Sequence, residues 1–228
     1  QAVLRNELYS AQFDGQTYGV TLRSPYAHAR ILSIDTSAAR DMPGVLAIYT
    51  HADVAGYGPI PCLVPLSGKV KTPRDMLAAD RVRFVGDGVA FVVAERRAGA
   101  RAAADAIYVD YEELPVAASM DAALEPDAPR IWDDAASNDL FLWEAGDAAA
   151  TDAAFGAAAH VTRLRIVQNR VAPTSMEVRA AIGRWSEDEG YTLNTGSQGV
   201  AGMRAQIAGQ ILKIPPEQLR VITQDVGG

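Results

Sequence analysis

An unbroken apolar run over residues 89–94 is the feature that most restricts how this chain can fold. A glycine-bounded turn, Gly86-Asp87-Gly88, precedes the run, and an alanine-rich helical stretch over residues 96–106 follows it. A second strand-like segment comes at residues 107–111. Strand, helix and strand in this order commonly form a right-handed crossover between parallel strands of one sheet. The first half of the chain is therefore predicted to be α/β, with the two apolar strands in its core.

Further elements of the first half follow from local patterns. Three more strands are expected, at residues 18–22, 29–35 and 45–49. Asp35 or Thr36 is suited to cap a short helix that ends at Pro43-Gly44. Thr50 and Asp53 have the spacing of a capping pair for one helical turn. Residues 55–75 carry Gly, Pro and Lys without periodicity, which predicts a long surface loop.

The sequence divides into two units joined by a polar segment. We expect a compact domain over residues 1–125, a linker over 126–155 and an incomplete second α/β unit over 156–228. Strands of the second unit are predicted at residues 161–167, 178–185, 191–194 and 219–223. Between the last two, apolar residues at spacings of three and four predict a helix that starts near Val200 and is broken by Pro215-Pro216.

Composition excludes several classes of protein and partner. The net charge of −7 argues against a nucleic-acid surface, which needs clustered Lys and Arg. Apolar runs are all shorter than the roughly 20 residues of a membrane helix, so no membrane partner is expected. The single cysteine, Cys62, excludes an intrachain disulfide and a cysteine-ligated iron–sulfur cluster held by this chain alone. We expect Cys62 to be a buried, inert thiol in a cytoplasmic protein.

Titratable residues outside the glycine loops give only weak indications of a site. The three histidines, His28, His51 and His160, lack metal-ligand spacing and are expected to be structural or at the surface. Glu177 precedes a predicted strand near an Arg, and a structural ion pair is the simpler interpretation of it.

Two glycine-containing loops follow the last two predicted strands. They are residues 195–199 and residues 224–228. If the strands are parallel, both loops leave the same edge of the sheet, where open α/β sheets bind ligands. The Gln198 amide could then donate hydrogen bonds to an oxo or carbonyl oxygen at the start of the helix. Spacing alone leaves open that the glycines only make turns and that Gln198 caps its own helix, since no G-x-G-x-x-G or Walker pattern is present.

Several longer strings resemble one enzyme family. In the first half they are RSPYAHARI at 23–31, PGV at 43–45, THADV at 50–54, VRFVGDGVA at 82–90 and VDYEELP at 109–115. In the second half they are QNRVAP at 168–173, Met176-Glu177, SQG at 197–199 and DVGG at 225–228. Together they resemble the molybdenum hydroxylase large subunit, found in xanthine dehydrogenase, aldehyde oxidase and aerobic carbon monoxide dehydrogenase. The implied fold is an α/β-hammerhead domain followed by the first part of a molybdopterin-binding domain.

The resemblance implies a molybdenum–molybdopterin cofactor and hydroxylation of a carbon centre, of the aldehyde or N-heterocycle class, with water as the oxygen source. It assigns cofactor binding to Gln198, Gly199, Gly227 and Gly228, with Gln198 bonded to an oxo ligand of molybdenum. It places no catalytic residue and no metal ligand in this chain, because the base glutamate lies downstream. It implies three partners besides a small-molecule substrate: the downstream molybdopterin-binding polypeptide, an FAD subunit and a [2Fe–2S] subunit.

Alternatives to this interpretation remain at the level of the sequence. The chain ends inside the family's glycine loop, so we expect it to be inactive without a second polypeptide. It could be a non-catalytic assembly module that reuses the fold. It could also belong to a relative without molybdenum, a hydrolase whose nucleophile is the new N-terminus formed by cleavage after Gly228.

Overall fold

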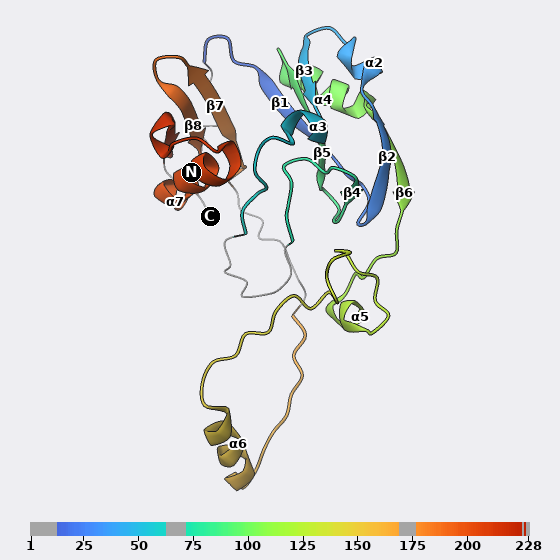
Figure 1. The fold of residues 1–228 in the computed structure, drawn as a ribbon, viewed down its shortest axis with the longest axis vertical. Helices are drawn as coiled ribbons and strands as arrows, with labels where there is room; N and C mark the ends of the chain where they lie inside the picture. The colour runs from blue at the N-terminus through green and yellow to red at the C-terminus, as the bar shows by residue number, and fades with distance from the viewer. Residues whose placement is uncertain (1–12, 63–71, 169–176, 225, 227–228) are drawn as a thin grey trace, which may run out of the picture.

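The computed structural model describes residues 13–62, 72–168, 177–224 and 226. Three small sheets carry the architecture, two in the first half and one near the C-terminal end of the described chain (Figure 1). Both sheets of the first half are antiparallel. No helix in the described ranges is long and apolar enough to cross a bilayer.

The first sheet has the strand order β1-β5-β3. Its strands are β1 (Tyr18–Arg23), β3 (Val45–Tyr49) and β5 (Gly88–Ala94). Val92 lies opposite Val20 on one side and Ile48 on the other. Helix α4 (Arg97–Ala106) packs three buried alanines against this sheet. Small side chains let the helix approach closely, and this gives the first region its largest apolar cluster.

The second sheet has the strand order β4-β2-β6, formed by β2 (Ala29–Asp35), β4 (Arg81–Val82) and β6 (Tyr108–Glu113). The expected parallel crossover from residues 89 to 111 is therefore wrong: β5 and β6 belong to different sheets. After α4 the chain pairs β6 antiparallel with β2, from Ala29–Glu113 to Asp35–Tyr108. The handedness rule applies only to strands of one sheet, and sequence order does not determine the partner of β6.

Strand β5 joins the two apolar clusters of the first region. Its Ala90, Val92 and Ala94 contribute to the cluster beneath α4. Val89 instead belongs to a second cluster with Ala29, Ala78 and Val82. These four residues are fully buried, whereas Phe91 in the same apolar run is 37% exposed, so the run is buried only in part. The alternation of the strand explains how one segment serves two clusters.

Caps and turns in this region follow the local signals. Helix α2 (Ser37–Arg40) begins after Thr36, and the Asp35 carboxylate, not Thr36, accepts hydrogen bonds from Ser37. Those bonds hold the pKa of Asp35 below its ordinary value. Helix α3 (His51–Val54) has the predicted capping box of Thr50 and Asp53. Gly86 has a φ of +93° in the predicted turn.

The middle of the chain contains two short helices, α5 (Met120–Leu124) and α6 (Ala148–Ala157). Between them, residues 130–138 fold back on β4. The Arg81 guanidinium donates to Asp133 at 3.0 Å, and Arg83 stacks on the Trp132 ring at 4.1 Å. The hydrogen bond and the charge of Arg81 hold the pKa of Asp133 below its ordinary value. The strand predicted at residues 161–167 is absent, because that segment is extended without a strand partner among the described residues.

The third sheet has the order β7-β8-β9, formed by β7 (Ala181–Ser186), β8 (Gly190–Thr195) and β9 (Leu219–Ile222). Between β8 and β9 lies a continuous helical rod of α7 (Val200–Gln206) and the π-helix η1 (Ile207–Leu212), followed by the 3-10 turn η2 (Pro216–Gln218). The rod ends at Lys213, which has a φ of +56°. The helix predicted from Val200 to the proline pair is thus confirmed, with a π-helical second half.

Two hydrogen bonds join the rod to the first region. The Gly58 N–H donates to the Ile211 carbonyl at 2.8 Å, and the Lys213 ammonium donates to the Gly56 carbonyl at 3.0 Å. Gly58 is buried, and a Cβ at this position would collide with the Gln210 carbonyl. The loop after α3 is therefore fixed against the end of η1, and only glycine fits at position 58.

Candidate functional site

Strands β8 and β9 are parallel, which decides where the glycine loops lie. Their register runs from Tyr191–Leu219 to Asn194–Ile222. The loops that follow Thr195 and Ile222 therefore leave the same edge of the third sheet, because the condition left open by the sequence is met. This edge is the carboxyl end of the parallel pair, the position at which α/β sheets bind ligands.

A hydrogen bond brings the two loops together. The Ser197 N–H donates to the Thr223 hydroxyl at 3.2 Å, and that hydroxyl donates to the Gln224 carbonyl at 3.3 Å. One side chain from the end of β9 thereby positions the loop after β8. Sequence analysis did not single out Thr223, although its place at the end of a strand opposite a glycine loop was a usable signal.

Helix α7 begins beside this junction. Gly199 is the N-cap residue, and the Met203 N–H donates to the Gly199 carbonyl at 2.9 Å as the first helical bond. The Gly199 N–H itself donates to the Ser197 hydroxyl at 3.1 Å. No side-chain hydrogen bond caps α7 among the described residues, so Gln198 does not cap its own helix. Gln198 is exposed, directly before the N-cap.

A carboxylate lies close to the same loop. A Cβ placed on Gly196 would lie 2.9 Å from Glu177 Oε1, so the carboxylate packs against the loop backbone. Glu177 is half-buried there. The structure places it beside the glycine loop, and the strand that was expected to begin near it starts only at Ala181.

The edge also offers space and an available donor. A Cβ on Gly199 or Gly202 would meet no atom within 4 Å among the described residues. Asn194, the last but one residue of β8, has a buried Nδ2 that makes no hydrogen bond within the described ranges. An unused buried amide donor costs free energy unless a further group accepts from it. Of the four residues predicted to bind cofactor, Gln198 and Gly199 lie here, and Gly227 and Gly228 lie outside the described residues.

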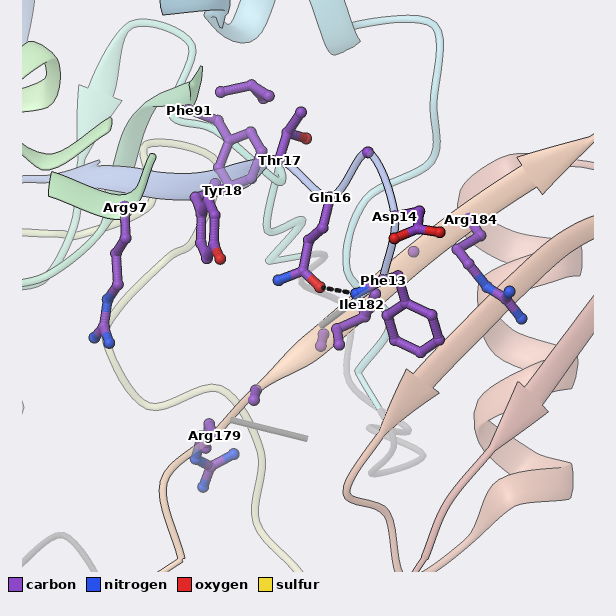
Figure 2. Close-up of a pocket in the computed structure, with 16 residues that line it drawn as sticks. Phe13, Asp14, Gln16, Thr17, Tyr18, Phe91, Arg97, Arg179, Ile182 and Arg184 are labelled. Atoms are coloured by element: carbon purple, nitrogen blue, oxygen red, sulfur yellow. Dashed lines mark hydrogen bonds between the residues drawn. The ribbon is translucent and has the colours of Figure 1, made fainter. Parts of the chain in front are cut away.

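A second cleft lies between the two regions of the chain (Figure 2). It has a volume of about 670 Å³ and is lined by β1 and its lead-in, by β5 and α4, and by residues 179–184. Arg184 from β7 stacks over the Phe13 ring at 5.1 Å, and the Phe13 N–H donates to the Gln16 side chain at 3.1 Å. Arg97 and Arg179 add positive charge to the lining. No sequence pattern indicated this basic cleft.

The remaining sequence candidates have structural partners. His28 is buried with Nδ1 2.9 Å from the Pro115 carbonyl, and His51 Nδ1 lies 3.1 Å from the Leu77 carbonyl. Within the described ranges no group of His, Cys, Asp and Glu side chains could hold a metal ion. The expectation that Cys62 is buried is wrong: its side chain is exposed in the structure.

Comparison with known proteins connects both regions to one family. Residues 9–115 match the aldehyde oxidase and xanthine dehydrogenase a/b hammerhead domain, and residues 131–228 match the molybdopterin cofactor-binding domain. A carbon monoxide dehydrogenase large chain from Afipia carboxidovorans is 33% identical over 98% of this chain and 29% of its own length. A probable xanthine dehydrogenase subunit from Bacillus subtilis is 35% identical over 95% of this chain and 28% of its own length.

The fold agrees with these matches. The crystal structure of quinoline 2-oxidoreductase from Pseudomonas putida 86 superposes with a TM-score of 0.83 and 34% identity, over 97% of this chain and 28% of that one. The chain thus spans less than a third of the length of these relatives. Two adjacent domain matches, together with a fold shared with a solved relative, lead to one conclusion: the chain belongs to the aldehyde oxidase and xanthine dehydrogenase family of molybdenum hydroxylases and carries its hammerhead domain and molybdopterin cofactor-binding region.

Proposed function

We propose that this chain is the N-terminal part of the molybdopterin-binding large subunit of an oxidoreductase that hydroxylates a carbon centre with water. The observation that carries the proposal is the parallel β8–β9 pair, which brings Gln198, Gly199 and Thr223 to one sheet edge at the start of α7. The substrate class is an aldehyde or an N-heterocycle, as the family resemblance implies.

The residues at this edge fit a polar, multiply hydrogen-bonding cofactor. The buried Asn194 Nδ2 is an unused donor within the described ranges, and the glycines at 199 and 202 leave room that a side chain would fill. The molybdenum–molybdopterin cofactor, when bound, supplies the two-electron oxidation and the activation of water. The described residues that would hold it are Gln198 and Gly199, and the family resemblance adds Gly227 and Gly228.

The chemistry of these side chains suits binding and orientation. The Gln198 amide donates hydrogen bonds without adding charge, so it orients a ligand oxygen and leaves the ligand's charge intact. Gly199 has no Cβ, so the ligand can approach the backbone closely. Thr223 holds the loop through Ser197 and thereby reduces the freedom of the residue that follows it, Gln198. The chain positions the cofactor, and the general base is expected in the downstream part of the subunit.

The proposed assembly has further components. The two relatives compared above are named as a large chain and as a subunit, which supports an assembly of several polypeptides. We assign FAD and [2Fe–2S] clusters to partner subunits, because one cysteine cannot ligate a cluster that needs four. An exposed thiol at Cys62 favours a reducing compartment, and we place the enzyme in the cytoplasm.

Replacement of Gln198 tests the proposal. In the assembled enzyme, Gln198→Ala should lower turnover by roughly 10²–10³, the usual effect of removing a hydrogen-bond donor that acts in the transition state. Molybdenum content and melting temperature should change little, since Ala is well tolerated at a helix start.

Gln210→Ala is the matched control, because Gln210 is an exposed glutamine at the far end of the same rod. It should leave turnover unchanged. Wild-type turnover in Gln198→Ala at full molybdenum occupancy would contradict the assignment of Gln198. A native assembly without molybdenum would contradict the proposed function and favour the non-catalytic or hydrolytic alternatives.

A further inference from the structure

Three glycines lie in or next to the loop that carries Gln198, and the space around them differs. A Cβ on Gly199 or Gly202 would meet no atom within 4 Å among the described residues. A Cβ on Gly196 would lie 2.9 Å from Glu177 Oε1 and 3.7 Å from the carboxyl carbon of the same side chain. The space that a side chain at position 196 would need is therefore occupied by a carboxylate.

Backbone conformation gives no reason for the glycine at position 196. Gly196 is not among the described glycines that have a positive φ. Only a positive φ would make the backbone itself favour glycine over an L-residue. The carboxylate of Glu177 is thus the reason, among the described residues, that a side chain does not fit at position 196.

The antiparallel register explains how Glu177 reaches the loop. Ala181, the first residue of β7, pairs with Thr195, the last residue of β8. The Thr195 hydroxyl also donates to the Ala180 carbonyl at 3.0 Å. Because the two strands run in opposite directions, the residues before β7 lie beside the residues after β8. Glu177, which is half-buried, therefore lies along one side of the loop.

Strand β9 holds the same loop from its other side. There the Ser197 N–H donates to the Thr223 hydroxyl at 3.2 Å. Gly196 and Ser197 are consecutive, so Glu177 and Thr223 contact the loop at two successive residues, immediately before Gln198. A single contact would leave the backbone free to pivot, whereas two successive contacts fix the direction in which the chain enters residue 198.

We propose that Glu177 is a positioning residue for Gln198: its carboxylate occupies the side-chain space of Gly196 and thereby fixes the backbone from which the Gln198 amide reaches the cofactor. The inference rests on the proposed function for what Gln198 binds, whereas the contact between Glu177 and the loop needs no bound cofactor. The contact is one of packing, so a glutamine at position 177, which has the same shape, should replace the glutamate. An alanine should not.

Substitutions at Glu177 in the assembled large subunit test the inference. Glu177→Ala should change the Mo(V) EPR signal of the dithionite-reduced protein in the same direction as Gln198→Ala, with little change in melting temperature. Glu177→Gln should restore the wild-type signal. Glu187→Ala is the matched control, because Glu187 is exposed in the turn at the other end of β7 and β8, and it should leave the signal unchanged.

Two results of this experiment would overturn the proposal. One is a wild-type EPR signal in Glu177→Ala at full molybdenum occupancy. The other is a signal in Glu177→Gln that is altered as much as in Glu177→Ala, because it would assign the effect to the charge of the carboxylate and not to its packing.

A double substitution tests the contact without the cofactor. Gly196→Ala places a methyl group against the carboxylate, so the amides of Ser197 and Gly199, both hydrogen-bonded, should exchange at least about tenfold faster. In Gly196→Ala with Glu177→Ala the methyl group enters the vacated space, and both rates should return to within about threefold of wild type. Additive effects of the two substitutions would overturn the proposal.

The two experiments separate this inference from the proposed function. A native assembly without molybdenum has no Mo(V) signal and contradicts the proposed function. Hydrogen exchange in the double variant still decides whether Glu177 holds the loop at Gly196, so either idea can fail alone.

Discussion

The two regions of the molecule differ in how far they complete their own cores. Fourteen of the seventeen buried apolar residues among the described ones lie between Ala29 and Ile107, and only Ala135, Ala208 and Leu219 come later. The hammerhead region closes two sheets and α4 around its clusters. The described part of the molybdopterin region has one three-stranded sheet and a helical rod, and its residues 139–168 are almost all exposed. Within the described residues, the first region therefore buries far more apolar side chains than the second.

Of the substitutions predicted here, Val92→Glu should cause the largest loss of stability in the first region. Val92 is fully buried between Val20 and Ile48, so a carboxylate there has neither water nor a partner. We expect a loss on the order of 3–5 kcal/mol in the free energy of unfolding of the first region. Urea denaturation of the assembled protein measures this loss, with hydrogen exchange of the β5 amides as the readout for the first region.

A substitution by Glu in the exposed residues 139–168 provides the contrast. Leu164→Glu replaces a side chain that is 80% exposed, so it should shift the stability of the first region by less than about 0.5 kcal/mol. Equal losses from the two substitutions would show that the regions unfold as one unit, and the comparison would not hold.

Gly58→Ala tests the joint between the two regions, which is the contact of Gly56 and Gly58 with the end of η1. The new methyl group would meet the Gln210 carbonyl, and backbone cannot turn aside as a side chain can. We expect Gly58→Ala to cost about 1–3 kcal/mol and to raise exchange at the amide of residue 58, which bonds to the Ile211 carbonyl. Gly56→Ala, where the methyl group would meet nothing within 4 Å, should change stability by no more than about 1 kcal/mol. Similar effects at both positions would argue against steric contact as the cause.

The smallest predicted effect concerns the contact of Asp133 with Arg81. The hydrogen bond and charge of Arg81 lower the folded-state pKa of Asp133, so the contact contributes stability above the ordinary Asp pKa of about 3.9. That contribution is lost as the pH falls through the lowered folded-state pKa. Carboxyl chemical shifts should show Asp133 titrating below its ordinary value, and Arg81→Gln should raise its pKa. An unchanged pKa in Arg81→Gln would rule out the contact as the cause.

Sequence reasoning succeeded where the signal is local. The bounds of β2 and β3 and the capping box at Thr50 follow from alternation and from side chains three residues apart. It failed where the answer depends on distant segments. The partner of β6 is β2, some eighty residues earlier, and no local pattern distinguishes that pairing from a parallel one with β5. At the candidate site, sequence reasoning showed that both loops would share an edge if the strands were parallel, but it left that pairing open. It did not predict the approach of Glu177 to Gly196, because the sequence between them gives no distance.

The joint at Gly58 has a consequence for the candidate site. The rod from Val200 to Leu212 has the joint at one end and Gln198 just before the other, about 20 Å away at the rise of a helix. A helix is stiff along its axis, so fixing the rod at Leu212 also limits the movement of its start at Val200. Two opposed contacts, one donated by each side, clamp its far end against shear and rotation. The hammerhead domain thus fixes the far end of the helix whose first turn follows Gln198.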